Sequence, residues 1–125
     1  MTITRQMYEF ATASAKTDTG PPVTGALHQM RWEQTGTADT GGDVAIYGQQ
    51  READTGNGFI AFDDNDCLGT DFQRLPRSAT HTVAGLADTG DDFLEAVVFA
   101  GERPRVRVTP AGGTVSGRLY LWFKD

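Results

Sequence analysis

The 125-residue sequence is poor in features that mark several large classes of protein. It contains one cysteine, Cys67, so no internal disulfide can form. Its longest strictly apolar runs, "AVVFA" and "LYLWF", have five residues each, so we expect no membrane association. The beginning "MTITRQMYEF" has no apolar core of the length that a secretory signal requires. These absences favour synthesis in the cytoplasm.

Positive charge and metal-binding patterns are also scarce. Lys and Arg total 11 against 17 Asp and Glu, which gives a formal net charge of −6 and argues against nucleic acid as a partner. His28 and His81 belong to no Cys/His/Asp cluster with the spacing of a metal site. The acidic segment 62–71, "FDDNDCLGTD", lacks the final Glu of a calcium loop, so we interpret it as a solvated loop. We therefore expect no metal and no cofactor.

Short strand patterns separated by Gly, Thr and Asp dominate the chain. Five segments have the composition of strands: 26–32, 43–48, 58–62, 105–109 and 118–123. Two further segments, 5–15 and 91–100, fit a strand or a helix, and their β-branched and aromatic content favours strands. The pattern predicts an all-β fold, an antiparallel β-sandwich or jelly roll in a single domain. We assign residues 26–125 to the sandwich. Residues 1–25 are an N-terminal arm or first strand that ends in the Gly/Pro turn "TDTGPPVTG".

Alternation within these strands predicts which side chains share a face. One face of 26–32 should carry Ala26, His28, Met30 and Trp32. In 118–123, one face should carry Leu119, Leu121 and Phe123, and the other Tyr120 and Trp122.

Asp-Thr-Gly, the catalytic triplet of aspartic proteases, occurs four times, at 18–20, 39–41, 54–56 and 88–90. A protease needs two such carboxylates to meet. Only 35 residues follow Gly90, too few for the flap and second apolar strand of a retroviral-type subunit, and the other three copies have polar approaches. We interpret all four copies as turns in which glycine supplies positive φ. We expect this φ at Gly41, Gly56 and Gly90, with Asp39, Asp54 and Asp88 accessible and far apart.

No Ser/His/Asp constellation is present, so we expect no catalytic residues and no enzymatic activity. A small hydrolase that uses an Asp pair such as Asp64 and Asp66 remains an alternative.

Two groups of residues are candidates for contacts with a partner. Arg103, Arg105 and Arg107 alternate along one strand, opposite Val106 and Val108. They form either a solvated outer face or a row, with Arg103 its weaker member, that meets acidic groups of an adjacent subunit or of a capsid protein. Pro104 indicates an edge or the start of that strand. The second group lies on the expected arm, where exposed apolar residues should pack on a neighbouring subunit. Its members are Met7, Tyr8 and Phe10, and Trp122 is a further candidate.

The segments "TGNGFIAF", "RLPRSATHTVAGL" and "GERPRVRVTPAGGTVSGRLYLWF" together resemble small virion proteins of tailed bacteriophages, over roughly residues 26–123. This resemblance implies a structural protein on the surface of the particle, first of all a capsid cement (decoration) protein that bridges capsomers. It also implies self-association, commonly as a homotrimer, and the major capsid protein as partner. Neck, tail and fibre components are related possibilities. The alternative is a carbohydrate- or receptor-binding module that stacks ligands on Trp32, Tyr47, Tyr120 or Trp122.

Overall fold

A computed structural model of the chain describes residues 2–36, 41–49, 59–64, 67–79 and 94–125. Every regular element among these residues is a β-strand, as the sequence predicts. The strands are β1 (Ile3–Thr12), β2 (Lys16–Thr19), β3 (Thr24–Gln34), β4 (Asp43–Gln49), β5 (Phe59–Asp64), β6 (Phe72–Arg74), β7 (Arg77–Ala79), β8 (Leu94–Ala100), β9 (Arg103–Thr109) and β10 (Val115–Lys124). The described residues include no helix that is long and apolar enough to cross a membrane.

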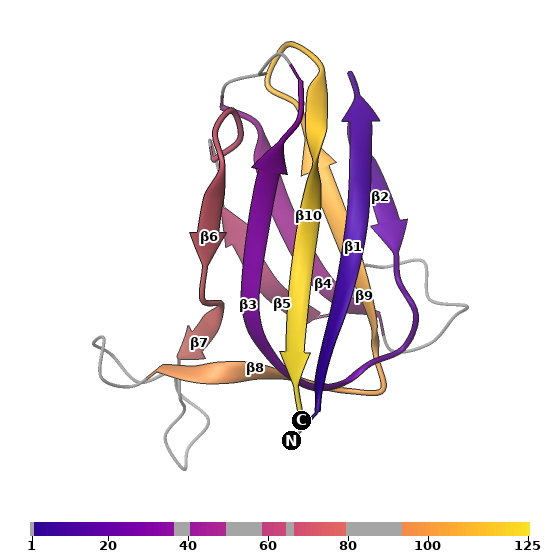
Figure 1. Ribbon diagram of the computed structural model, residues 1–125, viewed down its shortest axis with the longest axis vertical. Coiled ribbons are helices and arrows are strands. Elements are labelled where there is room, and N and C mark those ends of the chain that lie inside the picture. Colours follow the sequence, from indigo (N-terminus) through magenta and orange to yellow (C-terminus); the bar gives the residue numbers. More distant parts are fainter. Residues whose placement is uncertain (1, 37–40, 50–58, 65–66, 80–93) are drawn as a thin grey trace.

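The strands form two antiparallel sheets that pack face to face as a β-sandwich (Figure 1). The six-stranded sheet has the order β1-β10-β3-β8-β7, and β6 also pairs with β3. The four-stranded sheet has the order β2-β9-β4-β5. Both chain termini lie at the same end of the sandwich (Figure 1). This follows from the antiparallel pairing of the first strand, β1, with the last, β10, which is an inner strand paired with β1 on one edge and β3 on the other.

Alternating apolar side chains from both sheets fill the space between them. Along β10, every second residue from Val115 to Phe123 is buried, so the predicted face holds along the whole strand. The rings of Phe99 and Phe123 meet edge to face, with centroids 5.1 Å apart. Other large, fully buried side chains among the described residues include Phe10, Leu27, Met30, Trp32, Ile46, Leu119 and Leu121. This core uses one face of each sheet, and the other face of each sheet points away from it.

The first residues of the chain belong to the sandwich itself. All ten residues of β1 pair with β10, and the chain then crosses to the other sheet through β2. Tyr8 and Phe10 point into the core and are only 7% and 1% exposed. The expectation that these two side chains contact a neighbouring subunit is therefore wrong, because they fill the protein's own interior. Met7 points the opposite way and is 49% exposed.

A β-bulge changes the phase of side chains along β3. Trp122 pairs with Gln29 and Phe123 pairs with Leu27, so the residue between them, His28, has no partner in β10. Leu27 is consequently buried, and His28 is only half-buried. Met30 and Trp32 share the predicted face and are buried, whereas Ala26 and His28 do not lie on it.

The Asp-Thr-Gly copies do not all form the same structure. Gly41 has a φ of 89°, as expected for a turn. The copy at 18–20 corrects the turn interpretation, because Asp18 lies within β2 and Gly20 is not among the glycines with positive φ. Gly20 serves another purpose: a Cβ there would collide with the Tyr8 hydroxyl oxygen. The copies at 54–56 and 88–90, with Asp54, Gly56, Asp88 and Gly90, lie outside the described residues, as does Asp39.

Candidate interaction surface

An aromatic pair lies on the outer face of the six-stranded sheet, on the inner strand β10. Tyr120 and Trp122 are two residues apart on β10, so both point away from the core, and both are half-buried. Their rings are stacked, with centroids 5.9 Å apart and an interplanar angle of 26°. Met7 of β1 lies directly opposite Tyr120. We call Met7, Tyr120 and Trp122 the aromatic platform.

Two arginines flank the aromatic platform, one on each neighbouring strand. Arg5 of β1 lies opposite Trp122, and its guanidinium carbon is 5.6 Å from the centroid of the Tyr120 ring. Arg31 of β3 lies opposite Tyr120 on the other side. Arginine over an aromatic ring makes a favourable cation–π contact. Trp, Tyr, Met and Arg are enriched in protein interfaces, so these residues make this face a candidate binding surface.

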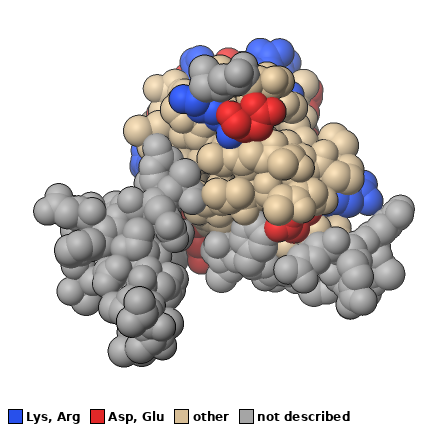
Figure 2. Space-filling model, turned by 90° about the horizontal axis from the view of Figure 1, so that it is seen from below, with Lys and Arg blue, Asp and Glu red and all other residues tan. Residues whose placement is uncertain are grey.

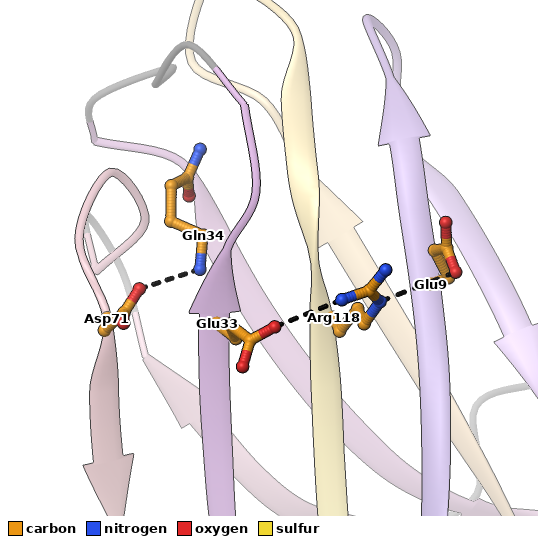
Figure 3. Close-up of polar contacts among 5 residues, drawn as sticks. All are labelled: Glu9, Glu33, Gln34, Asp71 and Arg118. Carbon is orange, nitrogen blue, oxygen red and sulfur yellow. Dashed lines mark hydrogen bonds and ion pairs between the residues drawn. The ribbon is translucent and has the colours of Figure 1, made fainter.

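A row of charged residues borders the platform. Arg118 of β10 lies between Glu9 of β1, 3.7 Å away, and Glu33 of β3, 3.2 Å away (Figure 3). The hydrogen bond to Glu33 and the charge of Glu9 raise the pKa of the Arg118 guanidinium. Farther along β3, the Gln34 N–H donates to the Asp71 carboxylate at 2.8 Å (Figure 3). The charged groups of this border thus pair within the chain. The aromatic platform is the part of the face that is suited to binding a partner.

The arginine row, Arg103, Arg105 and Arg107, lies on the outer face of the other sheet. The three alternate with buried Pro104, Val106 and Val108, as predicted. However, β9 is an inner strand flanked by β2 and β4, so Pro104 marks the start of a strand and not an edge.

The chain itself supplies partners or neighbours for part of this row. Arg103 Nε donates to the Gly20 carbonyl at 3.0 Å. Arg107 is exposed and lines a hollow of about 150 Å³ together with Asp43 and Asp63. These two carboxylates line the same hollow as Arg107, the one exposed residue of the row. The arginine row is therefore less suited than the aromatic platform to recruiting acidic groups of another molecule.

The candidate stacking residues differ in their access to solvent. Trp32 is fully buried, and its indole N–H donates to the Gln34 side chain at 2.9 Å, so it cannot stack on a ligand. Tyr47 is half-buried on the outer face of the four-stranded sheet. Tyr120 and Trp122 alone among these four form an adjacent pair on one face.

The residues considered for metal binding or hydrolysis can be placed in part. They contain no group of three or more His, Cys, Asp or Glu that could hold a metal ion. Asp64 forms an ion pair with Arg74 at 3.7 Å, and Asp66 lies outside the described residues. Burial, reinforced by the charge of Asp64, raises the pKa of the Cys67 thiol to about 11. This thiol is therefore protonated at neutral pH, which is the opposite of an activated nucleophile.

Charge is mixed at the end of the sandwich where the termini lie. Seen from this end, basic and acidic side chains are interspersed around a largely uncharged described surface (Figure 2). No field of one sign dominates this view, so steering of a highly charged partner is not its evident role.

Comparison of the chain with protein-family models, with curated proteins and with solved structures finds no match. The candidate surface therefore rests on the geometry described above.

Sequence patterns identified part of this surface. Trp122 was a candidate from the apolar terminal strand, and Met7 from its place near the N-terminus. Sequence patterns did not select Arg5 or Arg31. Arg5 lies two residues before Met7 of the platform, and Arg31 lies next to the core residues Met30 and Trp32 in an alternating segment. The signal that finds them is the register of β1 and β3 on β10, which no single strand pattern contains.

Proposed function

We propose that this chain is a non-enzymatic structural protein that binds a partner through the outer face of its six-stranded sheet. Following its resemblance to small virion proteins of tailed bacteriophages, we propose that the partner is a major capsid protein. In that role the chain is a cement protein that bridges capsomers on the particle surface and opposes the pressure of packaged DNA.

One observation carries the proposal: the half-buried rings of the aromatic platform, beside the exposed Met7, lie between two arginines on the outer face of a sheet. Buried aromatic anchors and arginines contribute most of the affinity at protein interfaces, and rigid strands need little ordering when they dock. A cement protein requires this kind of surface and requires no reactive group.

The first test is location and copy number. Purified particles from the source of the gene should contain the chain at a fixed ratio to the major capsid protein, measured by quantitative mass spectrometry. Absence from intact particles contradicts the virion role, whatever the platform binds.

The second test concerns the platform itself. A Tyr120→Ala, Trp122→Ala double variant should lose most of its occupancy on particles that lack the native chain, because truncating interface anchors costs about 2 kcal/mol or more each. Tyr47→Ala removes an aromatic ring from the opposite outer face and is the matched control. Equal binding by the double variant, the control and the unaltered chain contradicts the assignment of the surface.

A carbohydrate- or receptor-binding module of a phage tail, fibre or neck is the second candidate. The stacked pair Tyr120 and Trp122 favours it, because two neighbouring rings on an open face can stack against sugar rings. Binding of the unaltered chain to immobilised glycans, abolished by the same double variant, would support this function. Loss of particle binding without any glycan binding supports the cement role instead.

A further inference from the structure

Among the described residues, no strand pairs with the outer edge of β1, and the nearest segment is the β2–β3 connection, whose Pro21 carbonyl accepts a hydrogen bond from Gln6 Nε2 at 3.3 Å. β1 is an outer strand, and its ten residues pair with β10 without a register shift. Natural sheets usually blunt a long edge with Pro, Lys, a bulge or a covering segment. The β1 sequence, "ITRQMYEFAT", contains no Pro, Gly or Lys, and Figure 1 shows β1 as the outer strand of its sheet, next to β2 of the other sheet.

The other described edges are shorter or interrupted. β2 has four residues and is followed by Gly20-Pro21-Pro22, and β6 and β7 have three residues each. β5 has six residues and ends in Asp63 and Asp64. Among the described strands, β1 thus offers by far the longest regular edge.

The β1 sequence is complementary to itself when it is read antiparallel about Met7. In this register Arg5 lies opposite Glu9 of the second copy, Glu9 opposite Arg5, and Met7 opposite Met7. Ile3, which is 55% exposed, lies opposite Ala11. Opposite charges and apolar residues in directly facing positions stabilise antiparallel pairs, and like charges destabilise them. A two-fold axis centred on Arg5 or on Glu9 would instead place like charges together.

We propose that β1 pairs with β1 of a second copy of this chain about a two-fold axis at Met7. The pairing joins the two six-stranded sheets into one continuous sheet. It covers the exposed Met7 and satisfies the backbone groups of the free edge. Because Met7 lies between this edge and Tyr120, the aromatic platforms of the two copies become one surface across the axis. The proposal does not depend on which partner the platform binds.

Such an interface is isologous and closes as a dimer. The homotrimer implied by the resemblance to phage virion proteins would need a different contact, since one edge that pairs with itself cannot form a closed ring of three. The oligomeric state measured in solution therefore distinguishes the proposed dimer from the homotrimer.

Disulfide trapping tests the axis directly. In a Cys67→Ser background, Met7→Cys should cross-link to itself rapidly on mild oxidation, because facing residues in an antiparallel pair lie about 4.5–5.5 Å apart. Arg5→Cys is the matched control on the same face of the same strand. It should not cross-link, because position 5 is displaced from its own copy by four residues, roughly 13 Å along the strand. Equal trapping at the two positions, or none at position 7, overturns the proposal.

A charge exchange tests the register. In analytical ultracentrifugation, the unaltered chain should be a dimer. Arg5→Glu and Glu9→Arg should each weaken it about tenfold or more, because each creates two like-charge pairs. The double variant Arg5→Glu, Glu9→Arg should restore the dimer.

Glu33→Gln is the control, because it removes the other carboxylate partner of Arg118 without altering β1, and it should leave the dimer unchanged. Thermal unfolding checks that each variant is folded. If a charge variant is unfolded, the disulfide-trapping experiment still tests the proposal. A monomeric or trimeric native chain, or no restoration in the folded double variant, overturns the proposal.

Discussion

At the scale of single residues, Gly117 shows how closely the two inner strands approach. It lies on β10 with its Cα facing the core, where a Cβ would come 2.7 Å from Trp32 Cε2 and 2.7 Å from the Glu33 carbonyl oxygen. The Trp32 ring is fully buried and the carbonyl belongs to the backbone, so neither can move aside cheaply. We expect Gly117→Ala to lower the free energy of unfolding by about 1–3 kcal/mol, measured by urea denaturation.

Gly112 is the matched control for that substitution. It lies between β9 and β10, and nothing lies within 4 Å of the position that a Cβ would occupy. Gly112→Ala should be neutral or should stabilise the protein by up to about 1 kcal/mol, because alanine restricts the unfolded chain. Equal losses at both glycines would show that the tight packing of Trp32 is not the cause.

Cys67 provides a prediction about reactivity. Its pKa is raised from 9.0 to about 11 by burial and by Asp64. The thiolate is the reacting species, so at pH 8 the folded protein should react with iodoacetamide about 100-fold more slowly than the urea-unfolded chain. Alkylation followed by mass spectrometry measures both rates. Equal rates would mean that the thiol has the ordinary pKa in the folded protein.

At the scale of elements, the strands with apolar alternation were predicted from the sequence, and the short polar ones were not. β10 and β9 have the predicted faces because every second residue is apolar. β2, "KTDT", was interpreted as part of a turn because nothing in its composition distinguishes it from one. It becomes a strand because it adds to the edge of β9, which is a tertiary effect.

The bulge in β3 is a second feature that local alternation could not reveal. It is visible only in the pairing of β3 with β10, and it places Leu27 in the core in place of His28. We therefore expect Leu27→Ala to cost about 2–5 kcal/mol of unfolding free energy, as for other buried leucines.

His28→Ala is the contrasting variant on the same strand. It should cost less than about 1 kcal/mol, because the side chain is only half-buried and lies outside the core cluster. Urea denaturation of both variants distinguishes the bulged register from simple alternation, which predicts the reverse order of losses.

At the scale of the whole molecule, the sequence predicted the class of fold but only part of the candidate surface. Apolar periodicity identifies the inner faces, since burial requires it, whereas an outer face is free to carry almost any residue. The aromatic platform combines side chains of β1 and β10, which are far apart in the sequence and adjacent only in the fold. Tyr8 and Phe10 were misassigned because exposure cannot be inferred from nearness to a terminus.

The response of the folded protein to alkaline pH follows from two buried or half-buried groups. Burial, aided by Asp18, raises the pKa of the Tyr8 phenol above its ordinary value of 10.0, and the pKa of Cys67 is raised to about 11. Both groups are neutral when protonated, so the folded state holds its protons more tightly than the unfolded chain. Their contribution is fully present below pH 9 and is lost as the pH rises through the raised values.

We therefore expect ionisation of these two groups to leave the midpoint of urea unfolding unchanged from pH 7 to 9. It should lower the midpoint steadily between pH 9 and 11. Tyr8→Phe removes the phenol, whose hydroxyl donates to Gln6 Oε1, so this variant should start from a lower midpoint. Its midpoint should nevertheless fall less steeply above pH 10, because no buried phenol remains to ionise. Tyr120→Phe changes a tyrosine on the outer face and is the control, which should keep the slope of the unaltered chain. Parallel curves for Tyr8→Phe and the unaltered chain above pH 10 would show that ionisation of Tyr8 does not limit alkaline stability.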